Sequence, residues 1–194
     1  RVGSARPFQP RLALDIERMA SQSRLFLEAQ VVPADLLPAY SSVARDCEVA
    51  VTELLATMTA KDFVRLHGDC HCGNILWRDD TPHFVDLDDC INGPAIQDVW
   101  MFLNGETAQR EQQLSEFVAG YEEFHDFDPR QLHWIEALRT LRIMHHAHWL
   151  ARRWDDPAFP KAFPWFGQPR FWSDHILELR EQLAAMNEPT LRLL

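Results

Sequence analysis

The chain has 194 residues, a length typical of one domain that can bury a core of its own. Its composition, 46% hydrophobic and 25% charged residues, is that of a globular protein. It contains neither a signal peptide nor an apolar run long enough to span a membrane, so we expect a cytoplasmic protein with no membrane partner. The formal net charge of −10 disfavours a nucleic-acid partner held through its phosphates.

The first half of the chain is predicted to contain helices followed by short strands. Helices are expected over residues 12–27 and over residues 34–58, where apolar residues recur every three to four positions. Strands are expected over residues 63–66, 75–77 and 83–85, with a turn at 79–82. Residues 89–97 are predicted to form a linker, because Asn92-Gly93-Pro94 interrupts regular structure.

The second half is predicted to be helical. Helices are expected over residues 96–103, 108–124 and 128–153, and the last begins where Asp128 can cap a helix that has Pro129 at its first position. Residues 154–172, rich in proline and aromatic side chains, are expected to form an ordered irregular loop. A final helix is expected over residues 173–186. The fold is therefore predicted to be mostly α-helical with a small β patch.

Three polar residues around the predicted strands point to phosphoryl transfer. Asp69 lies on a loop between two short apolar strands, Asn74 follows five residues later, and Asp86 ends the next strand. An aspartate in this position can accept the proton of an incoming hydroxyl. Asn74 and Asp86 supply hard oxygen ligands, which suit the Mg²⁺ ions of a nucleoside triphosphate.

The order and spacing of these residues resemble the loops of protein-kinase-like enzymes, in which H-R-D-x-x-x-x-N precedes D-F-G. Gly68 stands in the place of the arginine, and Asp86-Leu87-Asp88 stands in the place of D-F-G. Both differences resemble the aminoglycoside phosphotransferase and choline kinase branch. Further blocks between residues 61 and 168, including F-V-D-L-D-D and N-G-P-A-I-Q-D-V-W-M, are similar to the bacterial stress response kinase A family.

This resemblance implies a protein-kinase-like α+β fold, of which residues 1–194 form the helical C-terminal lobe. The N-terminal nucleotide-binding lobe is expected to be absent from the chain. Such a lobe needs a glycine-rich loop and a strand lysine, whereas the chain has no G-x-G and its lysines are Lys61 and Lys161. The resemblance further implies an ATP- and Mg²⁺-dependent Ser/Thr protein kinase involved in stress response. Its expected partners are a protein substrate and its own N-terminal lobe.

The resemblance also implies roles for individual residues. Asp69 is expected to be the catalytic residue that orients the acceptor hydroxyl. Asn74 and Asp86 are expected to bind Mg²⁺, and Asp86 is also assigned a catalytic role because it joins the metal to the phosphates. His71 either contacts the γ-phosphate or substrate, or packs within the loop. His67 and Asp98 are expected to support the loop.

Three alternatives remain open from the sequence. A small-molecule kinase of the aminoglycoside, choline or homoserine type would share the same loops, because the acceptor pocket cannot be read from them. A non-catalytic scaffold lobe is suggested by the missing nucleotide-binding parts. A binuclear metallophosphoesterase is suggested by Gly68-Asp69-x-His71 and His145-His146-Ala147-His148, but the latter histidines lie in the middle of a predicted helix.

Overall fold

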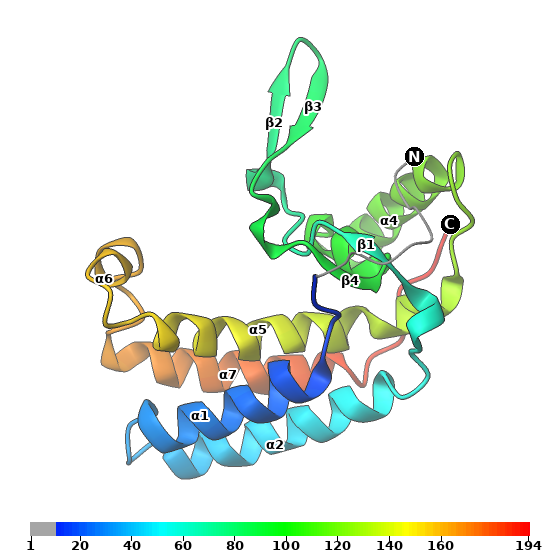
Figure 1. Cartoon of the computed structure of the whole chain (residues 1–194). Helices are drawn as coiled ribbons and strands as arrows, with labels where there is room; N and C mark the ends of the chain where they lie inside the picture. The colour runs from blue at the N-terminus through cyan, green and yellow to red at the C-terminus, as the bar shows by residue number, and fades with distance from the viewer. Residues whose placement is uncertain (1–10) are drawn as a thin grey trace. The chain divides into compact units, whose positions relative to one another are not determined.

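A computed structural model describes residues 11–194, which fall into two compact units (Figure 1). Of the described residues, unit 1 contains 11–14, 57–135 and 189–194, and unit 2 contains 15–56 and 136–188. The chain is mostly helical, with two small antiparallel ladders, which confirms the predicted fold class. Within residues 11–194 we find no helix that is both long and apolar enough to cross a membrane.

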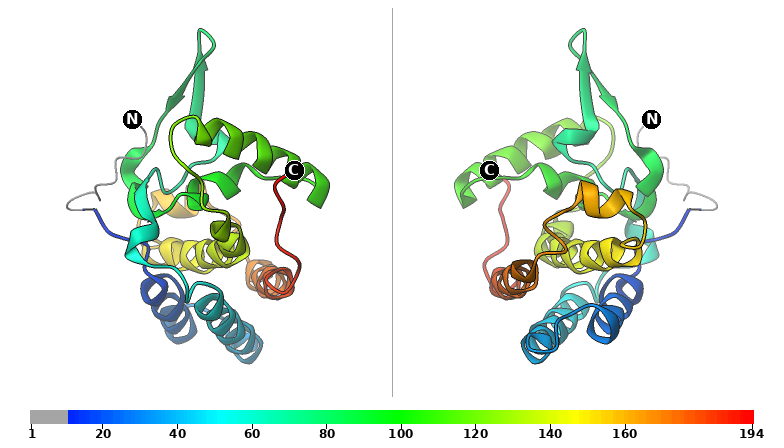
Figure 2. Two further views of the ribbon diagram at one scale, coloured as in Figure 1. Left: turned by 90° about the vertical axis from the view of Figure 1, so that its right-hand side faces the viewer. Right: turned by 90° about the vertical axis from the view of Figure 1, so that its left-hand side faces the viewer.

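Unit 2 is a bundle of helices. Its elements are a π-helical segment (Glu17–Gln22), α1 (Ser23–Gln30), α2 (Leu37–Leu54), α5 (Ile135–Arg152, of which Ile135 belongs to unit 1), α6 (Ala158–Ala162) and α7 (Pro169–Ala185). Helices α1, α2, α5 and α7 run alongside one another in the views of Figures 1 and 2. Side chains on their facing stripes are fully buried, among them Leu27, Tyr40, Val51, Leu141, Met144, Leu150 and Leu179. Cys47 belongs to the same core and donates a hydrogen bond to the main-chain oxygen of Leu179 at 3.4 Å.

The helices of unit 2 confirm the apolar periodicity but differ at their ends. Helix α2 lies inside the predicted range of 34–58. Helix α7 starts four residues earlier than predicted, because Gln168 has an extended backbone and Pro169 occupies the first helical turn. The predicted irregular stretch of 154–172 therefore contains α6 and the first turn of α7.

Unit 1 carries both β ladders. Strand β1 (Phe63–Leu66) pairs with β4 (Ile91–Pro94), and β2 (Ile75–Arg78) pairs with β3 (Thr81–Phe84). The β2–β3 hairpin turns at Asp79 and Asp80, both at positive φ, and extends away from the β1–β4 ladder (Figure 1). Helices α3 (Ile96–Val99) and α4 (Thr107–Glu122) follow. Short 3₁₀ helices are formed by Ala60–Asp62, Cys72–Asn74, Leu87–Asp89, Trp100–Phe102 and Pro129–Trp134.

The predicted linker of residues 89–97 is wrong, because Asn92 and Gly93 lie within strand β4. A Cβ atom on Gly93 would lie 2.8 Å from Cδ1 of Leu66, so glycine leaves room for the Leu66 side chain where β4 pairs with β1. Residues 12–14 pair with β4 as well, which makes the predicted start of the first helix wrong. Leu14 N–H donates to Asn92 O at 2.8 Å, and Asn92 N–H donates to Leu12 O at 2.9 Å.

A buried serine in unit 2 joins two histidines of α5. The Ser23 hydroxyl donates to Arg18 O at 3.2 Å, so its oxygen is left to accept from the Nδ1–H groups of His145, at 3.4 Å, and His148, at 3.2 Å. Burial lowers the pKa of His145 to about 4, and the neighbouring charge of Arg18 acts in the same direction. Burial also lowers the pKa of His148. Both rings are therefore held neutral in the folded protein.

These histidines predict a loss of stability in weak acid. Because the folded-state pKa values lie below the unfolded value of about 6.5, the unfolded chain binds more protons as the pH falls from 6.5 towards 4. Urea unfolding of the chain at pH 5 should give a free energy lower than at pH 7 by roughly 1–2 kcal/mol from His145 alone. The variant His145→Gln should show a smaller pH dependence, whereas His83→Gln, at an exposed position of β3 in unit 1, should behave like the wild type. Equal pH dependence in all three proteins would contradict the assignment.

Candidate active site

The backbone between β1 and the following loop is held by one carboxylate. Asp98, on α3, accepts the N–H of His67 with Oδ2 at 2.7 Å and the N–H of Gly68 with Oδ1 at 2.9 Å. Burial raises the pKa of Asp98, an effect that these two donors oppose. The sequence prediction that Asp98 supports the loop agrees with this geometry. Residues 67–74, hereafter the 67–74 loop, thus leave β1 in a defined direction.

Gly68 is required by the same geometry. Its φ is +88°, and a Cβ atom there would lie 2.1 Å from the main-chain oxygen of Asp89. No side chain fits between the two segments. Glycine at position 68 therefore allows the 67–74 loop to contact directly the segment that follows Asp86.

Asp69 lies beside His71 within the loop. Nδ1 of His71 accepts the N–H of Gly73 at 3.0 Å, so Nε2 carries the ring proton in the neutral tautomer. Nε2 lies 3.6 Å from Oδ2 of Asp69, whose side chain is 18% exposed. The predicted contact of His71 with phosphate or substrate is not tested by this geometry, which instead places the ring next to the proposed proton acceptor.

Asn74 connects the two ends of the loop. Its Nδ2 donates to the main-chain oxygen of Asp69 at 2.9 Å, and its own main-chain oxygen accepts the N–H of Val85 at 3.0 Å. The pairing of Ile75 with Phe84 continues this ladder. Because the amide nitrogen faces Asp69, the side-chain oxygen Oδ1 is the atom that can serve a cation.

Asp86 follows Val85 and ends the ladder that begins at Asn74. Its backbone is left-handed, with φ 60° and ψ 62°, a conformation uncommon outside glycine and least costly for asparagine and aspartate. It precedes the 3₁₀ turn Leu87–Asp89, which ends in a hydrogen bond from Cys90 N–H to Leu87 O at 3.3 Å. We call residues 86–90 the 86–90 turn. Asp86 is exposed, so its carboxylate is accessible to a metal.

His67 joins the same two segments from the other side. Its Nε2 donates to Val85 O at 2.8 Å, so the residue before Asp86 is bound both to His67 and to Asn74. The structure therefore brings together the segments that carry Asp69, Asn74 and Asp86, as their spacing predicts. It does so with hydrogen bonds to main-chain oxygens and between main-chain groups.

The donor set fits a magnesium ion that shares its coordination with phosphates. Asn74 Oδ1 and the Asp86 carboxylate are two hard oxygen donors, and Mg²⁺ is typically bound by one or two carboxylates together with water and substrate oxygens. Among the described residues, no group of three or more His, Cys, Asp and Glu side chains is arranged to hold a metal ion by itself. Cys70 is buried, which raises its pKa to about 12, and its thiol therefore stays protonated.

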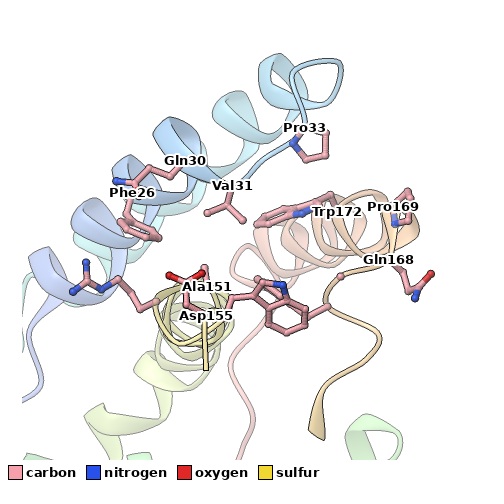
Figure 3. Close-up of a pocket in the computed structure, with 13 residues that line it drawn as sticks. Phe26, Gln30, Val31, Pro33, Ala151, Asp155, Gln168, Pro169 and Trp172 are labelled. Atoms are coloured by element: carbon pink, nitrogen blue, oxygen red, sulfur yellow. The ribbon is translucent and has the colours of Figure 1, made fainter. Parts of the chain in front are cut away.

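A separate groove lies in unit 2. It has a volume of about 740 Å³ and is bordered by α1, the end of α5 and the start of α7 (Figure 3). Its wall includes Phe26, Trp154, Phe166 and Trp172. None of the predicted site residues lines it, so the groove does not add to the site around Asp69.

Two residues near the site were missed by sequence reasoning. Arg11 donates to the main-chain oxygen of Asp88 at 2.8 Å, and Asn92 is 5% exposed within β4. Arg11 stands in no recognisable pattern. The sequence predicts that Asn92 interrupts regular structure, and only the pairing of β4 with β1 shows that it is buried in a strand.

Comparison with known proteins gives the family. Residues 4–138 match the model of the phosphotransferase enzyme family, APH. The chain is 45% identical over 190 residues to "Stress response kinase A" of Escherichia coli O157:H7, and this match covers 95% of the chain and 55% of that protein. It is 43% identical over 193 residues to "Serine/threonine protein kinase RdoA" of Salmonella typhimurium, covering 99% of the chain and 58% of that protein. The chain thus spans little more than half the length of these curated relatives.

Two solved structures share the fold. An amicoumacin kinase, hAmiN, in complex with AMP-PNP, Ca²⁺ and Ami matches with a TM-score of 0.57 and 15% identity, covering 96% of this chain and 70% of that one. A choline/ethanolamine kinase family protein from Mesorhizobium loti matches with a TM-score of 0.54 and 17% identity, covering 93% and 63%. The chain therefore has the same fold as these two proteins. By the match over residues 4–138, the chain belongs to the phosphotransferase enzyme family.

Proposed function

We propose that the chain is the C-terminal lobe of an ATP- and Mg²⁺-dependent kinase that phosphorylates serine or threonine on a protein. The observation that carries the proposal is the backbone connection of Asp69 and Asn74, through Val85, to the left-handed Asp86. This arrangement supplies the Asp69 carboxylate for the acceptor hydroxyl, and oxygen atoms of Asn74 and Asp86 for the metal. Catalysis of phosphoryl transfer depends mainly on such positioning and on charge stabilisation.

Asp69 orients the acceptor hydroxyl and accepts its proton as the acceptor oxygen bonds to the γ-phosphorus of ATP, while the bond from that phosphorus to the β–γ bridging oxygen breaks and ADP leaves. The transition state of phosphoryl transfer is loose, so the carboxylate has to be well placed rather than strongly basic. His71 acts on Asp69 electrostatically: its Nε2 lies 3.6 Å from Oδ2 of Asp69, near enough for the ring N–H to stabilise the negative charge of that carboxylate. This role is proposed in place of a direct phosphate contact.

Asn74 and Asp86 hold the metal. The proposed Mg²⁺ supplies neutralisation of the phosphate charge and alignment of the transferred group. Asp86 contributes a full negative charge and Asn74 a neutral carbonyl oxygen. The two side chains therefore balance only part of the charge of the proposed Mg²⁺, and the phosphates of the nucleotide balance the rest. The complex of the amicoumacin kinase with AMP-PNP and Ca²⁺ supports a nucleotide and a divalent cation in this family of folds.

The names of the relatives support a protein acceptor. Relatives that are 43–45% identical are named stress response kinase and serine/threonine protein kinase, and we infer the same activity, stress-response role and protein partner for this chain. A small-molecule kinase is the second candidate, favoured by the two solved structures that share the fold. Parallel assays of the full-length enzyme with proteins and with small alcohols separate the two candidates. A cytoplasmic location stays a prediction.

The site is proposed to need a further lobe. The chain spans about 55% of the length of its relatives, and its sequence lacks the glycine-rich loop and strand lysine that hold a triphosphate. The β2–β3 hairpin and the turn after it also expose large apolar side chains, namely Leu76, Trp77, Phe84 and Leu87. Apolar side chains that gather on a surface in this way are typical of an interface with another domain or protein. We infer that an N-terminal nucleotide-binding lobe covers it in the complete protein.

The variant Asp69→Asn of the full-length protein tests the reaction directly. It keeps the size of the side chain and removes its capacity to accept a proton, so turnover should fall by about 10²–10⁴-fold with ATP affinity nearly unchanged. Steady-state phosphorylation and ATP titration provide the two readouts. Asp46→Asn, at an exposed position of α2, is the matched control and should retain wild-type turnover. An unchanged rate in Asp69→Asn would remove this residue from the mechanism.

The isolated 194-residue chain should fold without catalysing. Its buried helices supply a core, but only Asn74 and Asp86 remain to bind the triphosphate through a metal. Circular dichroism should show a cooperative helical transition, while ATP turnover should appear only in the chain extended at its N-terminus. Robust turnover by the chain alone would show that it is not half of an enzyme. A folded extended chain without turnover would instead favour the scaffold alternative.

A further inference from the structure

The 86–90 turn is fixed at two consecutive carbonyl groups. The main-chain oxygen of Asp88 accepts a hydrogen bond from Nη1 of Arg11 at 2.8 Å. The main-chain oxygen of Asp89 lies so close to Gly68 that a Cβ atom there would be 2.1 Å away. The first contact is a hydrogen bond, and the second is a close approach of two main-chain segments that only glycine permits. Both contacts restrict where the turn, and Asp86 at its start, can lie.

Arg11 is itself held in place by β4. Leu14 N–H donates to Asn92 O at 2.8 Å, and Asn92 N–H donates to Leu12 O at 2.9 Å, which forms a parallel bridge centred on Ala13. The buried Asn92 side chain adds bonds from Nδ2 to Arg11 O at 3.2 Å and to Leu12 O at 3.4 Å. Residues 11–14, which we call the strap, therefore have a defined register, and the Arg11 side chain starts from a fixed backbone.

We propose that Arg11 is a positioning residue that holds the metal ligand Asp86 through the 86–90 turn, an inference that rests on the proposed function. Arg11 does not contact the reacting groups in this account. It binds Asp88 O and thereby limits the rotation of the turn, whose first residue already has a left-handed backbone. The strap connects this turn to the same strand pair, β1–β4, from which the 67–74 loop leaves.

The charge of Arg11 has a second consequence. Asp86, Asp88 and Asp89 place three carboxylates within four residues, and a nearby guanidinium reduces their mutual repulsion when no metal is bound. The same charge would oppose the binding of a cation. Two roles of Arg11 can therefore be told apart by the effect of removing it on Mg²⁺ binding. If Arg11 acts only through its charge, Mg²⁺ should bind more tightly without it. If Arg11 positions the turn, Mg²⁺ should bind more weakly.

The first test measures the turn itself, without any activity. Hydrogen exchange of the peptide spanning residues 86–90 should be at least about threefold faster in Arg11→Gln of the 194-residue chain, because the glutamine amide is two bonds too short to replace Nη1 of Arg11 at Asp88 O and the turn then opens more often. Arg11→Lys keeps a charged donor and should restore slow exchange. Arg170→Gln, an exposed arginine bonded to Asp174 in unit 2, is the control and should leave the peptide unchanged. Unchanged exchange in Arg11→Gln overturns the proposal.

The second test uses the full-length protein. Arg11→Gln should raise the Mg²⁺ concentration needed for half-maximal ATP turnover by about three- to tenfold, the effect of one lost hydrogen bond, while the rate at saturating Mg²⁺ stays near that of the wild type. Arg11→Lys should restore the wild-type requirement. An unchanged or lower Mg²⁺ requirement in Arg11→Gln overturns the positioning role even if the enzyme is a kinase. Wild-type protein without Mg²⁺-dependent turnover refutes the proposed function, and the exchange result then decides separately whether Arg11 holds the turn.

Discussion

The carboxylate of Asp98 accepts the backbone N–H groups of His67 and Gly68 at the same time, and the rest of the site is built on that pair of bonds. Hydrogen bonds to a charged acceptor contribute about 1.5–3 kcal/mol each, enough to offset much of the cost of burying the carboxylate. With the start of the 67–74 loop fixed, Gly68 can meet Asp89, and His67 can reach Val85 O. The 67–74 loop, which carries Asp69, and the 86–90 turn, which begins with Asp86, are thus both positioned through Asp98.

This construction explains why exposed functional side chains can still be well placed. Asp86 is exposed and Asp69 is partly exposed, so neither is held by a packed core. Their positions follow from main-chain bonds, through Asn74 O, Val85 N–H and the left-handed backbone of Asp86. The two carboxylates that we propose for substrate and metal remain accessible, while neighbouring residues such as His67 and Asp98 carry the positioning.

The proposed site residues could be selected from the sequence because the chemistry proposed for them depends on spacing along the chain. Asp69, Asn74 and Asp86 follow short apolar strands, and Asp98 opens a helix, so their order alone suggests how they meet. Strand β4 and the strap were missed for a physical reason: Asn92-Gly93-Pro94 has the local preferences of a turn, and only tertiary contacts with Leu66 and residues 12–14 make it a strand. The apolar periodicity predicts α2 correctly. The predicted first helix wrongly includes residues 12–14, whose hydrogen bonds go to β4.

The central claim is that Asp86 is placed to bind a metal that carries ATP. Isothermal titration of the full-length protein with ATP, with and without Mg²⁺, tests it most directly in the variant Asp86→Asn. Asparagine accepts the left-handed backbone and keeps the shape of the side chain, so only the charge is removed. The account predicts that the Mg²⁺-dependent part of the affinity falls by about tenfold or more, as expected for a lost charged ligand, whereas Asp46→Asn, at an exposed position of α2, leaves it unchanged. Wild-type affinity for Mg²⁺ and ATP in Asp86→Asn would contradict it.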